Sequence, residues 1–208
     1  PADPQFLRDL RAACDEYGIL LGMDEVQSGM GRTGKLFAHE WAGIAPDVMS
    51  AAKGIGGGFP LGAVLAREFV AKHMVPGTHG TTYGGNPLAC AAGNAVLDVM
   101  LAPGFLQDVE RKGAKLRAGA EAIARDFPQV FSEVRGLGLL LGMKCVVPSS
   151  EVQAACVAEG LMPITAGENV LRLAPPLVIT DADIDEALGM LHRAARRCLP
   201  STGQEAAK

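Results

Sequence analysis

Two short apolar runs, each followed by an ionisable side chain, constrain the fold of this chain most. The run Ile19–Met23 is followed at once by Asp24, and the strand-like run Asp47–Ala52 is followed by Lys53. Runs of this kind are typical of buried parallel strands. In open α/β sheets the ligand crevice lies at the carboxyl ends of the strands. The sequence therefore predicts an α/β fold in which Asp24 and Lys53 reach one crevice.

A lysine and an aspartate in one dry crevice suit pyridoxal phosphate chemistry. The amine of Lys53 would form a Schiff base with the cofactor aldehyde, and the carboxylate of Asp24 would keep the ring nitrogen protonated. Simpler interpretations compete with this one. A lysine beside glycines is commonly an exposed loop residue, and an aspartate after a strand is commonly a turn or helix cap.

Four segments of the sequence favour the catalytic interpretation. They are residues 24–34 (DEVQSGMGRTG), 52–63 (AKGIGGGFPLGA), 77–89 (GTHGTTYGGNPLA) and 169–177 (NVLRLAPPL). Through these segments the chain resembles the class III pyridoxal-phosphate aminotransferases, and the likeness runs from residue 1 as far as Cys198. It implies the PLP-dependent transferase fold type I, with part of a large domain (a mostly parallel sheet) and a small C-terminal α/β domain.

The resemblance implies how three residues hold the cofactor ring. Lys53 takes the place of the Schiff-base lysine, which also moves a proton between the substrate's α carbon and the cofactor. Asp24 takes the place of the partner of the pyridine nitrogen, and Gln27 that of the group that hydrogen-bonds the ring hydroxyl. Without the resemblance, Gln27 would be interpreted as an ordinary loop amide.

Three further residues are implied in phosphate and substrate binding. Thr82 matches the threonine that reaches the cofactor phosphate of the neighbouring subunit, and it precedes an expected helix start at Asn86, which suits an anion. Thr81 matches a substrate-contacting position of acetylornithine enzymes. Arg172 matches the arginine that clamps the substrate's α-carboxylate with its planar fork. The simpler alternatives are a loop hydroxyl for Thr82 and a solvated strand charge for Arg172.

Several other site types are disfavoured by the sequence. The run Gly54–Phe59 ends in phenylalanine where a dinucleotide fingerprint needs glycine, and Lys53 precedes the glycines instead of following them as in a phosphate-binding loop. No Gly-x-Ser-x-Gly elbow is present. The histidines and cysteines have no metal-ligand spacing, so no metal is expected.

Charge and hydropathy limit the partners that we expect. The net charge of −4 and the lack of a basic cluster argue against nucleic acid. No run approaches the roughly 20 apolar residues that span a bilayer, so no membrane partner is expected. Five scattered cysteines indicate free buried thiols in a reducing cytoplasm.

Periodicity and turn residues predict two domains and a tail. The expected large-domain part is 1–101, the small domain 102–199, and a disordered tail 200–208. The expected helices are 6–17, closed by Gly18, 86–100, 106–127, 150–159 with a Ser150 capping box, and 181–198 after Thr180. The expected strands are 19–23, 47–52, 61–66, 130–134 and 137–146, and Arg172 alternates with apolar residues on a further strand-like stretch.

The implied reaction transfers the terminal amino group of N-acetylornithine to 2-oxoglutarate, a step of arginine biosynthesis. Segments 160–162 and 166–172 look more like acetylornithine aminotransferases than their ornithine or 4-aminobutyrate relatives. Succinylornithine, ornithine and 4-aminobutyrate stay open as donors.

The family's size has a further implication for the isolated chain. The chain is expected to be the C-terminal half of a homodimeric enzyme with active sites shared across the interface, and inactive when isolated. A truncated cofactor-binding fragment without catalysis is the alternative.

Overall fold

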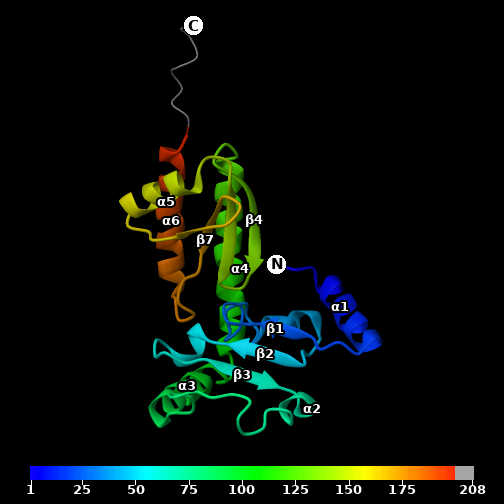
Figure 1. Cartoon of the computed structure of the whole chain (residues 1–208). Coiled ribbons are helices and arrows are strands. Elements are labelled where there is room, and N and C mark those ends of the chain that lie inside the picture. Colours follow the sequence, from blue (N-terminus) through cyan, green and yellow to red (C-terminus); the bar gives the residue numbers. More distant parts are fainter. Residues whose placement is uncertain (200–208) are drawn as a thin grey trace, which may run out of the picture. The chain divides into compact units, whose positions relative to one another are not determined.

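The computed structural model describes residues 1–199, which form two compact units, Pro1–Val109 and Glu110 onward. Figure 1 shows the order of the elements within each unit. The α/β class expected from the sequence is confirmed, because both units combine helices with a sheet. The predicted disordered tail, 200–208, lies outside the described residues.

A three-stranded sheet organises the first unit. Its order is β1 (Gly22–Asp24), β2 (Val48–Ala51), β3 (Ala63–Ala66), with β1 and β2 parallel and β2 and β3 antiparallel. Figure 1 shows β2 in the middle. Because β1 and β2 are parallel neighbours, the segments that leave their carboxyl ends begin at the same edge of the sheet.

The third strand differs from the buried parallel strand that we expected. β3 runs antiparallel to β2, and its residue Val64 is 67% exposed. Residues 52–62 alone connect the two strands, whereas a parallel crossover needs about a dozen or more residues and usually a helix. The connection is therefore too short for the parallel arrangement.

Helix α1 (Pro4–Tyr17) begins and ends where its capping residues lie. The Asp3 carboxylate accepts a hydrogen bond from the Gln5 N–H at 2.7 Å, and Gly18 closes the helix in the left-handed conformation, as predicted. The strand predicted to start at Ile19 starts only at Gly22. Ile19 is 59% exposed, and no strand of the described chain pairs with it.

The remaining elements of the first unit frame the loops around the strand ends. They are η1 (Ala38–Ala42), η2 (Lys53–Gly56), α2 (Glu68–Ala71) and α3 (Pro87–Met100). The Asn86 side chain caps α3 by accepting from the Ala89 N–H at 2.9 Å, which confirms the predicted helix start. A Cβ on Gly93 of α3 would lie 2.8 Å from Leu61, so α3 packs closely on the segment before β3.

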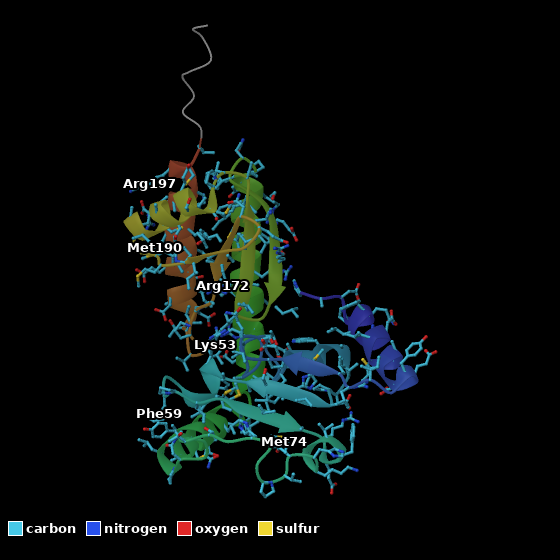
Figure 2. All side chains as sticks on the ribbon, viewed as in Figure 1. Lys53, Phe59, Met74, Arg172, Met190 and Arg197 are labelled. Atoms are coloured by element: carbon cyan, nitrogen blue, oxygen red, sulfur yellow. The ribbon has the colours of Figure 1, made fainter. Side chains whose placement is uncertain are left out.

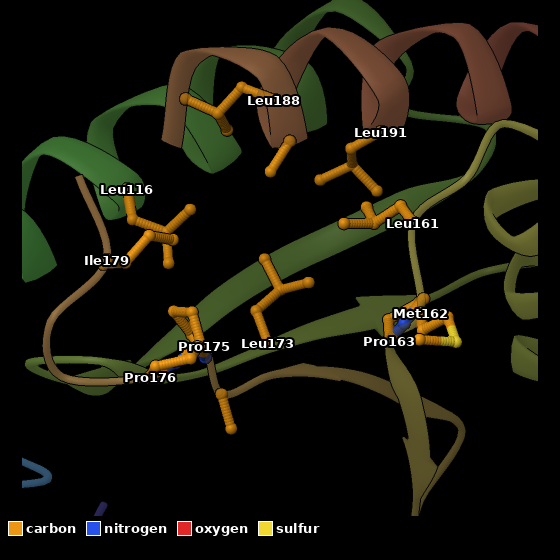
Figure 3. A pocket seen from close by; sticks show the side chains of 12 residues that line it. Leu116, Leu161, Met162, Pro163, Leu173, Pro175, Pro176, Ile179, Leu188 and Leu191 are labelled. Carbon is orange, nitrogen blue, oxygen red and sulfur yellow. The ribbon is translucent and has the colours of Figure 1, made fainter. Parts of the chain in front are cut away.

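The second unit is an antiparallel sheet with helices. Its strands are β4 (Phe131–Leu137), β5 (Leu140–Cys145), β6 (Ile164–Ala166) and β7 (Val170–Leu173), in the order β4-β5-β7-β6. Its helices are α4 (Phe105–Asp126), which starts before the unit boundary, α5 (Ser149–Ala158) and α6 (Asp181–Arg197). Figure 3 shows apolar side chains of α4 and α6 facing the sheet. The fully buried residues Leu141, Leu171 and Leu191 belong to this core.

Helices α5 and α6 of the second unit are capped at their starts in different ways. Thr180 and Asp183 form the predicted capping box of α6, with the Asp183 N–H donating to the Thr180 hydroxyl at 3.1 Å. The capping box expected at Ser150 is wrong, because α5 begins one residue earlier. The Ser149 N–H instead donates to the side-chain carbonyl of Asn169 at 2.7 Å, so a residue from a distant turn completes this helix end.

Candidate active site

Asp24 lies at the carboxyl end of β1, beside the end of β2. It is the register partner of Ser50, and the Ser50 hydroxyl lies 3.4 Å from its Oδ1. The same Oδ1 accepts from the Val26 N–H at 2.9 Å. The chain from Ser50 to Lys53 can span at most about 11 Å. The structure therefore brings Asp24 and Lys53 to one edge of the sheet, as the sequence predicts.

Lys53 has a backbone conformation that non-glycine residues seldom adopt. It opens η2 with a φ of 51°, which costs on the order of 1 kcal/mol for an ordinary residue. The turn after it is held by the Ile55 N–H to the Ala52 carbonyl at 3.3 Å. Figure 2 labels the Lys53 side chain at this end of the sheet. Strain of this kind is found most often at active sites and ligand-binding sites.

The loop after Asp24 packs against the turn that carries Lys53. A Cβ on Gly54 would approach the Cβ of Met30 to 3.1 Å, so a larger residue there would push the two segments apart. Met30 itself is buried and has a φ of 54°. Two of the four segments that carried the family resemblance thus form one packed structure.

A buried carboxylate that the sequence reasoning missed lies directly behind Asp24. Glu25 is 3% exposed, and its Oε1 accepts from the His39 N–H at 2.9 Å and lies 3.2 Å from the His39 Nδ1. The hydroxyl of Ser28 donates to its Oε2. The available signal was alternation: in an extended segment, the neighbour of an outward-pointing Asp24 points inward.

The remaining predicted cofactor and phosphate residues belong to the same unit. Gln27 is exposed in the loop after β1, and Thr81 and Thr82 are exposed in the loop before α3. The Thr81 hydroxyl accepts from the Gly84 N–H at 3.1 Å, so it already closes a local turn. Their proposed roles stay predictions.

Arg172 lies on the second unit, in a strand as predicted. It is half-buried in β7, where its register partners are Gly142 of β5 and Ile164 of β6. Figure 2 labels it on this strand. Because it belongs to a different unit from Lys53, its substrate-binding role also stays a prediction.

The dry crevice expected around the lysine is not formed by the first unit alone. Both Asp24 and Lys53 are exposed. Large apolar side chains of the first unit are exposed as well, among them Leu20 at 52% and Tyr83 at 80%. Within this unit the strand ends therefore stay open to solvent.

The second unit contains an apolar cavity. It has a volume of about 230 Å³ and is lined by apolar side chains of α4, α6 and the segments around β6 and β7. Figure 3 shows Leu116, Leu173 and Leu188 around it. Since its lining side chains are all apolar, it offers no side-chain partner for a phosphate or a carboxylate.

The cysteines show how burial affects the thiols. All five are free; Cys14, Cys145 and Cys156 are buried as expected, but Cys90 is exposed. Burial raises the pKa of the Cys156 thiol to about 12, which leaves it unreactive at neutral pH.

Two further features of residues 1–199 bear on function, namely metal-binding clusters and helices that could cross a membrane. In this part of the chain no cluster of histidine, cysteine, aspartate or glutamate has a geometry that could hold a metal ion. Within the same residues, no helix taken singly is long and apolar enough to cross a membrane. The bent pair α3 and α4 meets that requirement together, by length and composition alone.

Comparison with known sequences gives a consistent result. The family described as aminotransferase class-III matches residues 1–195. Acetylornithine aminotransferase of Mesorhizobium japonicum is 54% identical over 208 residues, which are 100% of this chain and 52% of that protein. The protein of the same name from Rhodobacter capsulatus is 55% identical over 94% of this chain and 50% of its own length. The chain thus spans about half the length of the curated relatives it matches.

Comparison with solved structures agrees with the sequence result. N-acetylornithine aminotransferase from Stenotrophomonas maltophilia has a TM-score of 0.85 and 39% identity, covering 95% of this chain and 52% of that one. Ornithine aminotransferase from Plasmodium yoelii has a TM-score of 0.88 and 31% identity, covering 94% of this chain and 52% of that one.

Proposed function

The chain belongs to the class III aminotransferase family, and we propose that it forms the lysine-bearing half of an enzyme that moves an amino group from an amino donor to a keto acid. The observation that carries this proposal is the placement of Asp24 and Lys53 at the carboxyl ends of adjoining parallel strands. About half of each curated relative lies outside the matched region. Tests of this function therefore need a full-length enzyme that contains this chain.

Enzymes of this class work with pyridoxal 5′-phosphate, and the residues at the strand ends fit that cofactor. The Lys53 amine can hold the cofactor aldehyde covalently. The Asp24 carboxylate, which accepts only a short-range backbone bond and a long contact from Ser50, has capacity left for a protonated ring nitrogen. When bound, the cofactor supplies an electron sink for the carbon that bears the reacting amine.

Each residue has a task that its own chemistry allows. With the cofactor bound, the free amine of Lys53 would move the proton between the substrate carbon that bears the reacting amine and the cofactor carbon. Gln27 offers an amide to the ring hydroxyl, and Arg172 offers a planar fork to the substrate carboxylate. Thr81 is assigned a substrate contact.

We assign Thr82 to the cofactor phosphate of a neighbouring subunit. This assignment requires at least two subunits, and we propose a homodimer. The support is exposure: residues 71–85, including Thr82, are exposed throughout, as a segment that meets another chain would be. Replacing Thr82 by alanine should weaken cofactor retention without preventing attachment to Lys53. Unchanged retention would count against the assignment.

We assign N-acetylornithine as the amino donor, 2-oxoglutarate as the acceptor, and the cytoplasm as the location. The relatives named acetylornithine aminotransferase are 54% and 55% identical to this chain, whereas the ornithine aminotransferase structure is 31% identical. Ornithine is the second candidate, because that structure has the higher TM-score of 0.88.

A coupled assay that measures glutamate formation tests this function. Acetylornithine should be used faster than succinylornithine, ornithine and 4-aminobutyrate, and Lys53→Ala should remove both the activity and the visible absorption of bound cofactor. Equal rates with all four donors would contradict the substrate assignment. A Lys53→Ala enzyme with unchanged visible absorption would contradict the site.

A further inference from the structure

Glu25 is a charged residue next to the site whose burial the proposed function leaves unexplained. Asp24 and Gln27 point outward, whereas Glu25 between them is 3% exposed. A buried carboxylate is costly unless several donors satisfy it. Here Ser28 and His39 supply them, so the chain maintains a complete hydrogen-bonded cluster directly behind the site.

The backbone of Glu25 is held as firmly as its side chain. Its N–H donates to the Ser50 carbonyl of β2 at 2.9 Å, and its carbonyl accepts from the Gly29 N–H at 2.9 Å. A Cβ on Gly29 would lie 2.7 Å from that carbonyl, so the turn closes tightly around Glu25. Glu25 therefore joins β2, the turn and η1 at one point.

The Asp24 side chain, in contrast, makes few hydrogen bonds of its own. Its carboxylate receives one backbone N–H two residues away and one contact of 3.4 Å from Ser50. Its direction is consequently set by the backbone that Glu25 fixes. Gln27 lies in the same turn, one residue before Ser28, whose hydroxyl donates to the Glu25 carboxylate.

We propose that Glu25 is a positioning residue, which fixes Asp24 and Gln27 for the cofactor ring through its buried hydrogen bonds to Ser28 and His39. The inference rests on the proposed function, because it requires that Asp24 meets the ring nitrogen. Glu25 touches neither cofactor nor substrate. In metal sites, outer groups of this kind commonly change metal affinity or activity by about 10- to 100-fold, and we expect an effect of that order on cofactor affinity here.

The experiment measures the dissociation constant of pyridoxal phosphate from the full-length enzyme, together with the melting temperature of the apoenzyme. The variants are Asp24→Asn, Glu25→Gln and the double variant. Glu25→Gln keeps the shape of the side chain but presents an NH₂ group to one of its donors, and it should weaken cofactor binding by about tenfold. Its kcat should fall while the KM for the amino donor stays unchanged.

Glu40→Gln is the matched control. Glu40 is an exposed carboxylate of η1 that accepts a single backbone bond, from the Phe37 N–H at 2.8 Å. It belongs to the same loop as His39 but does not contact Glu25. Its replacement should leave cofactor affinity unchanged, so a loss seen only in Glu25→Gln is specific to the buried cluster.

The double variant separates positioning from a general loss of stability. If Glu25 acts through Asp24, the loss of affinity in the double variant will be clearly smaller than the sum of the two single losses in free energy. Additive losses, or a Glu25→Gln affinity equal to that of Glu40→Gln, would overturn the inference and leave the proposed function intact. An Asp24→Asn enzyme with unchanged affinity would overturn the proposed function as well.

Ser28→Ala provides the same cycle if Glu25→Gln does not fold. It removes a single donor from the Glu25 carboxylate and leaves the contacts of His39 in place. Its effect on cofactor affinity should be smaller than that of Glu25→Gln, and it too should be non-additive with Asp24→Asn. An additive effect would overturn the inference.

Discussion

Replacing Asn169 should destabilise the second unit strongly. Its side-chain carbonyl accepts from the Ser149 N–H at 2.7 Å, and its NH₂ group donates to the carbonyls of Cys145 and Val147 at 2.8 and 2.9 Å. These three bonds join the end of β5 to the start of α5. Each contributes about 1 kcal/mol, because a buried partner left unpaired loses its hydration without compensation.

The backbone of Asn169 adds a further contribution. Its φ of 59° lies in the left-handed region, which asparagine tolerates better than alanine by on the order of 1 kcal/mol. Asn169→Ala should therefore lower the free energy of unfolding by about 4 kcal/mol, a large part of the 5–15 kcal/mol typical of a domain. With a urea m-value near 2 kcal/mol/M, the midpoint should fall by about 2 M.

Hydrogen exchange detected by mass spectrometry reports on this unit by itself. Peptides from β5 and β7 should lose protection in Asn169→Ala, whereas Asn94→Ala, an exposed asparagine in α3, should leave them unchanged. Asn169→Gly should cost about 1 kcal/mol less than Asn169→Ala, because glycine removes the backbone penalty alone. A loss below about 1 kcal/mol in Asn169→Ala would refute the reasoning.

Three other predictions depend on single contacts. Gly29→Ala should cost about 1–3 kcal/mol of stability, measured by urea unfolding, because its Cβ would lie 2.7 Å from the Glu25 carbonyl. Gly167→Ala is the control and should cost little, because its Cβ would meet no atom within 4 Å. Equal costs of the two substitutions would contradict this reasoning. The Leu21 N–H and Arg11 lower the pKa of Asp47, so the advantage in melting temperature of the wild type over Asp47→Asn should be complete above about pH 4 and decrease as pH falls through the lowered pKa. Arg111 lowers the pKa of Asp181 to about 2, so the advantage of the wild type over Arg111→Met should disappear between about pH 4 and pH 2. In either case, a difference independent of pH would show that the interactions of the ionised carboxylate are not responsible.

Local signals made most helices predictable. Gly18 ends α1, Asn86 starts α3, and Thr180 with Asp183 starts α6, each through contacts within a few residues. Such capping interactions depend on the chain's own neighbours, so the sequence contains all the information they need. Strand β7 was likewise predictable from the apolar residues around Arg172.

The elements that were predicted wrongly depend on distant residues. Helix α5 starts at Ser149 because Asn169 supplies the acceptor that Ser150 was expected to provide. Strand β1 is shorter than the apolar run before it, since no strand of the described chain pairs with Ile19. The orientation of β3 is determined by the length of a connection and not by its apolar residues.

The sequence predicted where the candidate site lies, but not the buried contacts that support it. Asp24 and Lys53 could be placed together because neighbouring parallel strands end at one edge of the sheet. The burial of Glu25 could not be predicted, because it requires His39 to come back across the turn and satisfy the carboxylate. The exposure of Lys53 also differed from the expectation of a dry crevice.

Reduction of the full-length enzyme with borohydride and subsequent peptide mapping test the attachment of the cofactor most directly. Borohydride makes the link between the cofactor and its lysine permanent, so the modified peptide identifies the residue. We expect the label on the peptide that contains Lys53, and on no other lysine peptide. Label on a different lysine, or none at all in an enzyme that retains visible cofactor absorption, would contradict the assignment of this site.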